Sequence, residues 1–151
     1  MKKILISISV LFFIVLFSGI SNAQDIVGQW KTIDDETNEA KSVVEIWKNP
    51  SDGLYYGKII KIFPKPGDDP NPLCENCPGD KKNKPIIGMV IITKMKKVDK
   101  NLWDDGEILD PESGNVYDCK MWIENGNLHV RGYLGWSLIG RSQVWLPYKG
   151  K

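Results

Sequence analysis

The stretch NVYDCKMWIENGNLHVRGYL, residues 115–134, decides the fold class. Its first half places apolar and polar side chains alternately, with one set formed by Tyr117, Cys119, Met121 and Ile123. A period of two is typical of a strand with one buried face. Asn125-Gly126 follows, and both residues tolerate the positive φ that a two-residue hairpin turn requires. The stretch therefore predicts two antiparallel strands joined by a tight hairpin.

The rest of the chain repeats this pattern. Residues 24–151 contain one alanine, Ala40, but all nine prolines and all six tryptophans. Helices favour Ala and exclude Pro, whereas Val, Ile, Tyr and Trp suit a pleated surface. Turn signals such as Asp52-Gly53 and Asp110-Pro111 separate about eight strand-like runs: 26–31, 41–48, 54–63, 87–96, 101–109, 115–124, 127–134 and 140–146. Short connections predict an all-β fold, a single antiparallel up-and-down barrel, because closure leaves no exposed edge.

One segment departs from the pattern. Residues 64–85 hold six of the nine prolines and show no apolar periodicity. Long loops in compact domains are often functional. We expect one domain, residues 24–151, with a single long Pro-rich loop.

Residues 1–23 have the three parts of a secretory signal peptide. Lys2 and Lys3 precede an apolar run over 4–17, and small side chains follow at 21–23. The run is too short for a membrane-spanning helix, which needs about 20 apolar residues. We expect cleavage before Gln24, a periplasmic or secreted protein without a transmembrane segment, and no lipid anchor, since no cysteine lies near the cut.

The charge argues against a nucleic-acid partner. The chain has 20 basic and 19 acidic residues, and without Lys2 and Lys3 it is close to neutral. Its densest basic stretch, residues 94–100, is short and falls on a predicted strand and turn. Nucleic-acid binding needs a basic patch that neutralises several phosphates.

The pair Cys74-x-x-Cys77 allows three interpretations. A disulfide that staples the loop is favoured by export into an oxidising compartment. A redox motif would need a thiolate at a helix N-terminus, which a Pro-rich loop does not offer. A zinc site could recruit Cys119 and His129, although the spacing is irregular. We expect the disulfide, a buried Cys119, and neither metal nor cofactor.

Catalysis has little support. The chain has no Gly-x-Ser-x-Gly motif, and its single histidine, His129, falls on a predicted strand. Adjacent carboxylates such as Asp34-Asp35 and Asp68-Asp69 are typical of solvated turns. We therefore expect a protein that is not an enzyme.

The barrel interior is the main functional candidate. Eight strands enclose room for packed side chains or for one small ligand. Aromatic walls with a few polar groups form small-molecule pockets, although the same rings can simply fill a core. The candidate ligand-binding residues are Tyr56, Tyr117, Met121, Arg131, Tyr133 and Trp145.

An ordered set of short motifs covers almost all of residues 24–151. It comprises Gly28-Gln29-Trp30, Gly57-Lys58-Ile59, Gly88-Met89, 103–106, Asp110-Pro111 with Gly114 and Tyr117, 131–135 and 140–145. Together they resemble the bacterial "domain of unknown function 2147" family. The resemblance implies an exported, lipocalin-like barrel without an established activity. The chain departs from the family where a Cys-x-x-Cys follows residues 68–72, and where Leu146-Pro147 follows Trp145 in place of the usual arginine.

The resemblance also implies a structural pair. In lipocalin-like barrels the tryptophan of a Gly-x-Trp motif lies across one barrel end, and a basic residue of the last strand packs over it. Trp30 and Arg141 are the matching residues here.

The sequence thus favours non-enzymatic binding of a small, partly apolar ligand. One alternative is an envelope interaction protein that contacts a protein partner or membrane surface through its Pro-rich loop and surface aromatics such as Trp122. The other is a metal or redox site at the cysteine loop.

Overall fold

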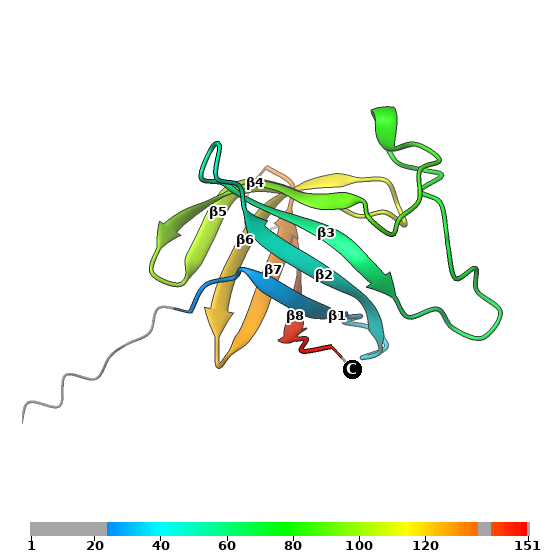
Figure 1. The fold of residues 1–151 in the computed structure, drawn as a ribbon, viewed down its shortest axis with the longest axis horizontal. Coiled ribbons are helices and arrows are strands. Elements are labelled where there is room, and N and C mark those ends of the chain that lie inside the picture. Colours follow the sequence, from blue (N-terminus) through cyan, green and yellow to red (C-terminus); the bar gives the residue numbers. More distant parts are fainter. Residues whose placement is uncertain (1–23, 136–139, 151) are drawn as a thin grey trace, which may run out of the picture.

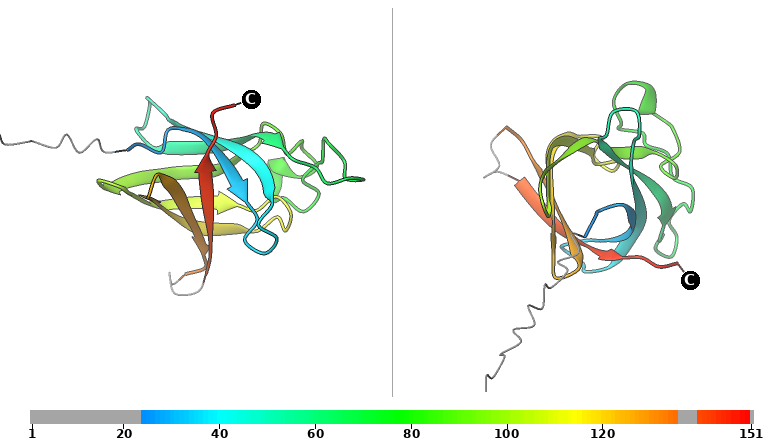
Figure 2. Two further views of the ribbon diagram at one scale, coloured as in Figure 1. Left: turned by 90° about the horizontal axis from the view of Figure 1, so that it is seen from below. Right: turned by 60° about the vertical axis from the view of Figure 1, so that its left-hand side comes forward.

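The computed structural model describes residues 24–135 and 140–150, which form one closed antiparallel barrel (Figures 1 and 2). Each strand pairs with its neighbours in sequence, and the last pairs back to the first. The strands are β1 Gly28–Ile33, β2 Ala40–Lys48, β3 Tyr55–Ile62, β4 Val90–Asp99, β5 Leu102–Leu109, β6 Val116–Glu124, β7 Asn127–Tyr133 and β8 Gly140–Pro147. The predicted all-β, up-and-down barrel is confirmed. The predicted signal peptide, residues 1–23, lies outside the described residues.

The hairpin predicted from residues 115–134 forms in the expected register. Glu124 pairs with Asn127 across the turn, and the positive φ values fall on Asn125 (52°) and Gly126 (78°). β4 begins at Val90, later than the sequence pattern suggests. A turn over 86–89, closed by a hydrogen bond from Met89 N to Ile86 O (3.1 Å), comes first.

The connections between strands fall at two opposite ends of the barrel, because neighbouring strands run in opposite directions. The β1–β2, β3–β4 and β5–β6 connections lie at one end, which we call the mouth, together with the end of β7 and the start of β8. The β2–β3, β4–β5 and β6–β7 turns lie at the other end. The long Pro-rich segment is the β3–β4 connection, so it belongs to the mouth. Within the described ranges, its only helical element is the short 3₁₀ turn η1, Gly79–Lys81.

The end opposite the mouth is plugged by the segment that precedes β1. Ile26 is completely buried, and its carbonyl oxygen accepts a hydrogen bond from the Trp30 indole nitrogen at 2.7 Å. Trp103 is also completely buried and packs edge-on against Tyr55, with ring centroids 5.9 Å apart. The Trp103 indole nitrogen is buried without a hydrogen-bond partner among the described residues. A buried indole N–H is stabilised by an acceptor, which the Ile26 carbonyl supplies to Trp30 without opening the core to water. We call this the plugged end.

Arg141 does not pack over Trp30, so that prediction is wrong. Trp30 lies opposite Pro147, near the end of β8, whereas Arg141 is near the start of β8. At about 3.3 Å per residue, the two β8 positions are about 20 Å apart. Arg141 therefore lies at the mouth, where its guanidinium pairs with Asp35 and with Glu36.

We predict that Trp30→Ala lowers the free energy of unfolding by about 3–5 kcal/mol, because it leaves a cavity in the plugged end and an unpaired Ile26 carbonyl. Trp122→Ala is the control. Trp122 is half-buried on the outer face, where it stacks on His129 at 5.1 Å, and its loss should cost clearly less. Urea unfolding followed by circular dichroism measures both. Equal losses would show that Trp30 is not a plug.

Candidate functional site

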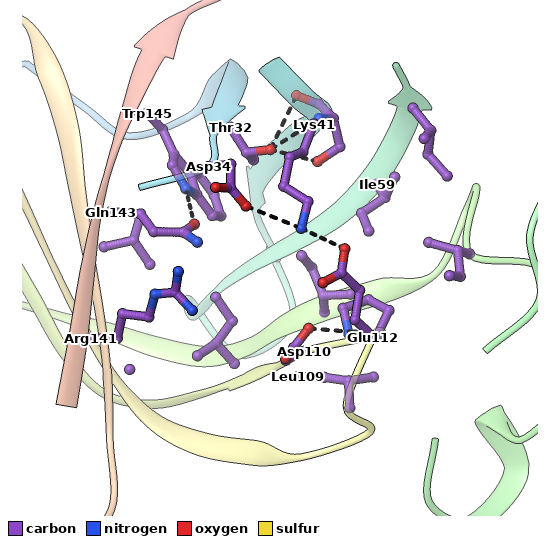
Figure 3. Close-up of a pocket in the computed structure, with 18 of the residues that line it drawn as sticks. Thr32, Asp34, Lys41, Ile59, Leu109, Asp110, Glu112, Arg141, Gln143 and Trp145 are labelled. Atoms are coloured by element: carbon purple, nitrogen blue, oxygen red, sulfur yellow. Dashed lines mark hydrogen bonds and ion pairs between the residues drawn. The ribbon is translucent and has the colours of Figure 1, made fainter. Parts of the chain in front are cut away.

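A cavity of about 1110 Å³ opens at the mouth and extends into the barrel (Figure 3). Its apolar wall comes from strands all round the barrel. Ile59, Val130 and Trp145 lie within β3, β7 and β8 and form its deep part, whereas Ile91 and Leu109 lie at the mouth ends of β4 and β5. All five side chains are buried. Small-molecule pockets are usually apolar concavities of about 300–1,000 Å³, so this cavity has the size and character of such a site.

A few polar groups lie among the apolar ones. The Thr32 and Ser42 hydroxyls are 2.8 Å apart across β1 and β2. The Trp145 indole nitrogen donates a hydrogen bond to Gln143 Oε1 at 3.0 Å. Thr32 and Gln143 both line the cavity (Figure 3). Convergent polar groups in an apolar wall can fix the orientation of a ligand.

Two turns at the mouth share one local design. Residues 34–39 (DDETNE) join β1 to β2, and residues 110–115 (DPESGN) join β5 to β6. In each, the first aspartate accepts a hydrogen bond from the backbone N–H two residues on, at 3.0 Å and 3.1 Å. The hydroxyl three residues on donates to the same carboxylate. The residue four positions on has a positive φ, 59° and 75°. Asx turns of this kind suit Asp followed by Ser or Thr and then Asn or Gly.

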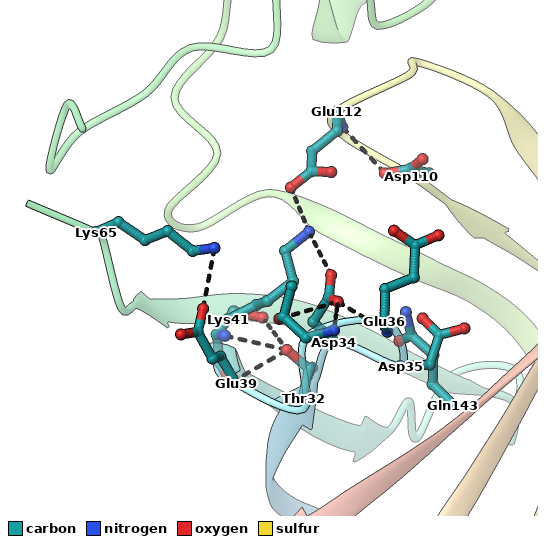
Figure 4. Close-up of polar contacts among 12 residues, drawn as sticks. Thr32, Asp34, Asp35, Glu36, Glu39, Lys41, Lys65, Asp110, Glu112 and Gln143 are labelled. Atoms are coloured by element: carbon teal, nitrogen blue, oxygen red, sulfur yellow. Dashed lines mark hydrogen bonds and ion pairs between the residues drawn. The ribbon is translucent and has the colours of Figure 1, made fainter. Parts of the chain in front are cut away.

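The shared design places Glu36 and Glu112 at equivalent positions on two walls of the mouth (Figure 4). It also fixes the charge of Asp34. Hydrogen bonds from the backbone N–H groups of Thr37 and Glu36 to its carboxylate lower the pKa of Asp34 to about 2. Asp34 therefore stays ionised at any physiological pH.

Three cations join the parts of the mouth to one another. Lys41 contacts Glu112 of the β5–β6 turn and Asp34 of the β1–β2 turn, with its Nζ 3.5 Å from Asp34 Oδ2 (Figure 4). Burial opposes the charge of Lys41, but the two carboxylates outweigh it and raise the lysine pKa. Lys65 of the long loop pairs with Glu39 at 2.9 Å.

Arg141 forms the third link. It joins β8 to the β1–β2 turn by pairing with Asp35 and with Glu36, the latter at 3.2 Å. The hydrogen bond from the Arg141 guanidinium lowers the pKa of Asp35.

Carboxylates outnumber cations at the mouth. Seven carboxylates and three cationic side chains line the cavity, a net charge of −4. The β1–β2 turn supplies Asp34, Glu36 and Glu39, the long loop Asp68 and Asp69, and the β5–β6 turn Asp110 and Glu112. The whole chain has a formal net charge of +1, so the negative charge is concentrated here.

The long loop is held by the predicted disulfide. Cys74 and Cys77 are bonded to each other, with both residues buried. The Cys74 N–H donates to Lys84 O at 2.9 Å, which folds residues 73–85 into a compact unit that we call the disulfide knot. The remaining arm, residues 64–72, borders the cavity.

The disulfide knot docks on the β5–β6 turn. Asn76 Nδ2 donates to Glu112 O at 3.1 Å. A Cβ placed on Gly114 would lie only 1.9 Å from Asn76 O, so this turn position requires glycine both for its φ of 75° and for the close approach. The knot thereby braces the wall that carries Glu112.

The zinc alternative is not realised. The sulfurs of Cys74 and Cys77 are bonded to each other, Cys119 is buried inside the barrel wall, and His129 stacks on Trp122 outside it. No group of three or more His, Cys, Asp and Glu side chains within the described ranges could hold a metal ion.

Three of the six predicted ligand-binding residues line the cavity: Tyr117, Tyr133 and Trp145. Tyr117 and Trp145 lie on β6 and β8. Tyr133 borders the cavity at the end of β7, but it shares the outer face of that strand with Arg131, and its hydroxyl donates to Asp104 Oδ1 at 3.3 Å. Desolvation and the nearby Asp104 carboxylate raise the pKa of Tyr133.

The other three residues lie elsewhere, which corrects the prediction. Met121 is completely buried in the packed core and does not line the cavity. Tyr56 stacks on Trp47 with centroids 5.9 Å apart and donates its hydroxyl to Asp52. Arg131 lies between the cavity-lining residues Val130 and Gly132, so its side chain points to the other face of β7, where it donates to Ser142 Oγ.

Sequence reasoning missed the acidic residues of the mouth and the polar wall residues Thr32 and Gln143. Gln143 had a usable signal, because it alternates with Val144 and shares the face of Trp145. The carboxylates of the mouth had no such sequence signal, because an aspartate that forms a turn looks the same in sequence at either end of the barrel.

The fold and the cavity define a lipocalin-like barrel. Its structure matches that of "Protein HP1028 from the human pathogen Helicobacter pylori", described as belonging to the lipocalin family, with a TM-score of 0.71 and 18% identity. The match covers 83% of this chain and 84% of that one. Residues 28–146 match the family described as "Uncharacterized protein conserved in bacteria (DUF2147)", and the chain belongs to that family. No curated protein matches the sequence. No helix within the described ranges is long and apolar enough to cross a bilayer.

We predict that peptide mapping under non-reducing conditions finds Cys74 linked to Cys77 and Cys119 as a free thiol. Cys119 should react with iodoacetamide only after unfolding, because burial excludes the reagent and raises the pKa of its thiol. Unfolded protein in urea is the control for reactivity. A bridge between Cys119 and either loop cysteine would contradict both the topology and the docking of the disulfide knot.

Proposed function

We propose that the barrel binds one small, partly apolar ligand without transforming it chemically. The observation that carries this proposal is the open cavity of about 1110 Å³, whose deep wall is apolar while its opening is charged. Ile26 and Trp30 occupy the opposite end, so a ligand would enter and leave through the mouth.

The apolar wall supplies the driving force. Burial of apolar surface contributes about 25 cal/mol per Å², so a ligand that buries about 300 Å² of apolar surface gains about 7 kcal/mol. Loss of translational and rotational freedom offsets part of this gain. We therefore expect dissociation constants of tens of micromolar or weaker for ligands of this size, and tighter binding for those that bury more apolar surface. Thr32 and Gln143 would add orientation through hydrogen bonds.

A second candidate is an interaction through the disulfide knot and its flanks. Leu73 and Ile87 are large apolar side chains that are 48% and 39% exposed on this connection. Isolated exposed apolar residues are common, and only a contiguous patch would indicate a partner. The cavity is the stronger observation.

The neutral dye N-phenyl-1-naphthylamine tests the proposal, because it becomes fluorescent in apolar sites. We expect one dye per barrel with micromolar affinity. Gly132→Leu should weaken binding at least about tenfold. A Cβ on Gly132 would make ordinary van der Waals contact, at 3.4 Å, with Ile108 Cγ2 and Tyr117 Cβ. Because Gly132 lines the cavity, the rest of a leucine side chain would occupy part of its volume.

Tyr56→Phe is the matched control, because Tyr56 lies on the outer face, and it should bind the dye like the unmodified protein. Ile108→Trp provides a second cavity-filling variant, and thermal unfolding shows whether each variant is folded. Absence of dye binding, or equal binding by the folded cavity-filling variants, would refute a ligand cavity.

A further inference from the structure

We propose that the ligand is an amphipathic cation: an apolar body with an amine or quaternary ammonium headgroup that the acidic mouth selects. This inference rests on the proposed function and specifies the ligand class of the same site. The carboxylates alone would not define a site. They matter because they surround the opening of a cavity whose inner wall is apolar.

Polarity changes with depth in the cavity. The side chains of Val130 and Trp145, within β7 and β8, form the buried wall, whereas the turns at the mouth carry the charged groups. A ligand with one apolar end would place that end inside the barrel and leave its polar end among the carboxylates. The arrangement therefore orients an amphiphile with its headgroup at the mouth.

The cations of the mouth are already engaged with carboxylates. Lys41 pairs with Asp34 and Glu112, Lys65 pairs with Glu39, and Arg141 pairs with two acidic residues of the β1–β2 turn. An anionic headgroup would have to share one of these cations with a carboxylate that is already close to it, and it would meet the repulsion of the surrounding acidic side chains. The net charge of the mouth thus disfavours an anionic ligand even though three cations are present.

A cationic headgroup can approach carboxylates that are not paired with the cations of the mouth. None of these three cations pairs with Asp68 or Asp69 of the long loop. Their carboxylates instead accept backbone hydrogen bonds from Lys65 N at 3.1 Å and from Asn71 N at 2.8 Å. With a net charge of −4 around the opening, the mouth attracts a cation without loss of an existing ion pair. A cleft with walls of low polarity focuses such a field, which raises the local concentration of the oppositely charged ligand.

Competition between three ten-carbon probes tests the inference. Decyltrimethylammonium, decanol and decanoate have tails of similar length with a cationic, a neutral and an anionic headgroup. Each is used to displace the bound naphthylamine dye, the two ions below their micelle concentrations and decanol below its solubility. We expect the cation to bind about tenfold more tightly than the anion at low salt, with decanol between them. The preference should shrink at 0.5 M NaCl, because charges at the mouth are then screened within a few ångströms.

Charge-neutralising variants of similar shape locate the preference. Asp68→Asn with Asp69→Asn keeps the acceptor oxygens of the loop and should reduce it. Further addition of Glu36→Gln and Glu112→Gln brings the mouth to neutrality and should abolish it, while decanol binds as before. The control is Asp99→Asn with Glu124→Gln, which removes two carboxylates at the plugged end and should leave the preference unchanged.

The outcomes separate this inference from the proposed function. If decanol and the dye bind but decanoate binds as tightly as the ammonium compound, the cationic class is wrong and the ligand cavity stands. The same holds if the folded neutral-mouth variant retains the preference. If none of the probes binds, both proposals fail. Should the fourfold variant not fold, the Asp68 and Asp69 pair gives the same readout.

Discussion

The hydrogen bond from the Trp30 indole to the Ile26 carbonyl, 2.7 Å long and fully buried, is the contact on which the architecture depends. An eight-stranded barrel has two open ends and no preference between them. Here the Trp30 indole and the segment before β1 fill one end, and the indole N–H and the Ile26 carbonyl that this brings inside bond to each other. The cavity of the barrel is therefore reached from the mouth, and the properties of the site follow from the residues that line that end.

At the mouth, the turns between strands have two roles. Asp34 and Asp110 organise the β1–β2 and β5–β6 turns by accepting backbone and hydroxyl hydrogen bonds. The same turns hold Glu36 and Glu112 above the cavity. Because Asn76 of the disulfide knot fastens the second turn, the long loop contributes to the rigidity of the mouth as well as to its charge. The same short segments thus stabilise the mouth and carry the carboxylates that would select the ligand.

The sequence could predict the barrel, the hairpin at Asn125-Gly126 and the disulfide, because each depends on local pattern or compartment. It predicted less about which face a residue takes. The β3 sequence YYGKIIKI has apolar residues on both faces, so Tyr56 could not be assigned outward from periodicity. To place Arg131 and Met121 outside the cavity lining, one must know the strand register and how deep each residue lies in the barrel, and the sequence shows neither. The pair of Trp30 and Arg141 was taken from the resemblance to lipocalin-like barrels, and nothing in the sequence showed that the two residues lie at opposite ends of the barrel.

The central claim is that a ligand enters the mouth and stops above the plug, and the indole N–H resonances in a ¹⁵N-labelled sample test it most directly. During titration with decanol, the Trp145 indole signal should shift, because its N–H bonds to Gln143 in the cavity wall. The Trp30 indole, held by the Ile26 carbonyl, and the Trp47 indole on the outer face should stay in place. A shift at Trp47 with a constant Trp145 signal would show that the ligand binds outside the barrel and would contradict the account.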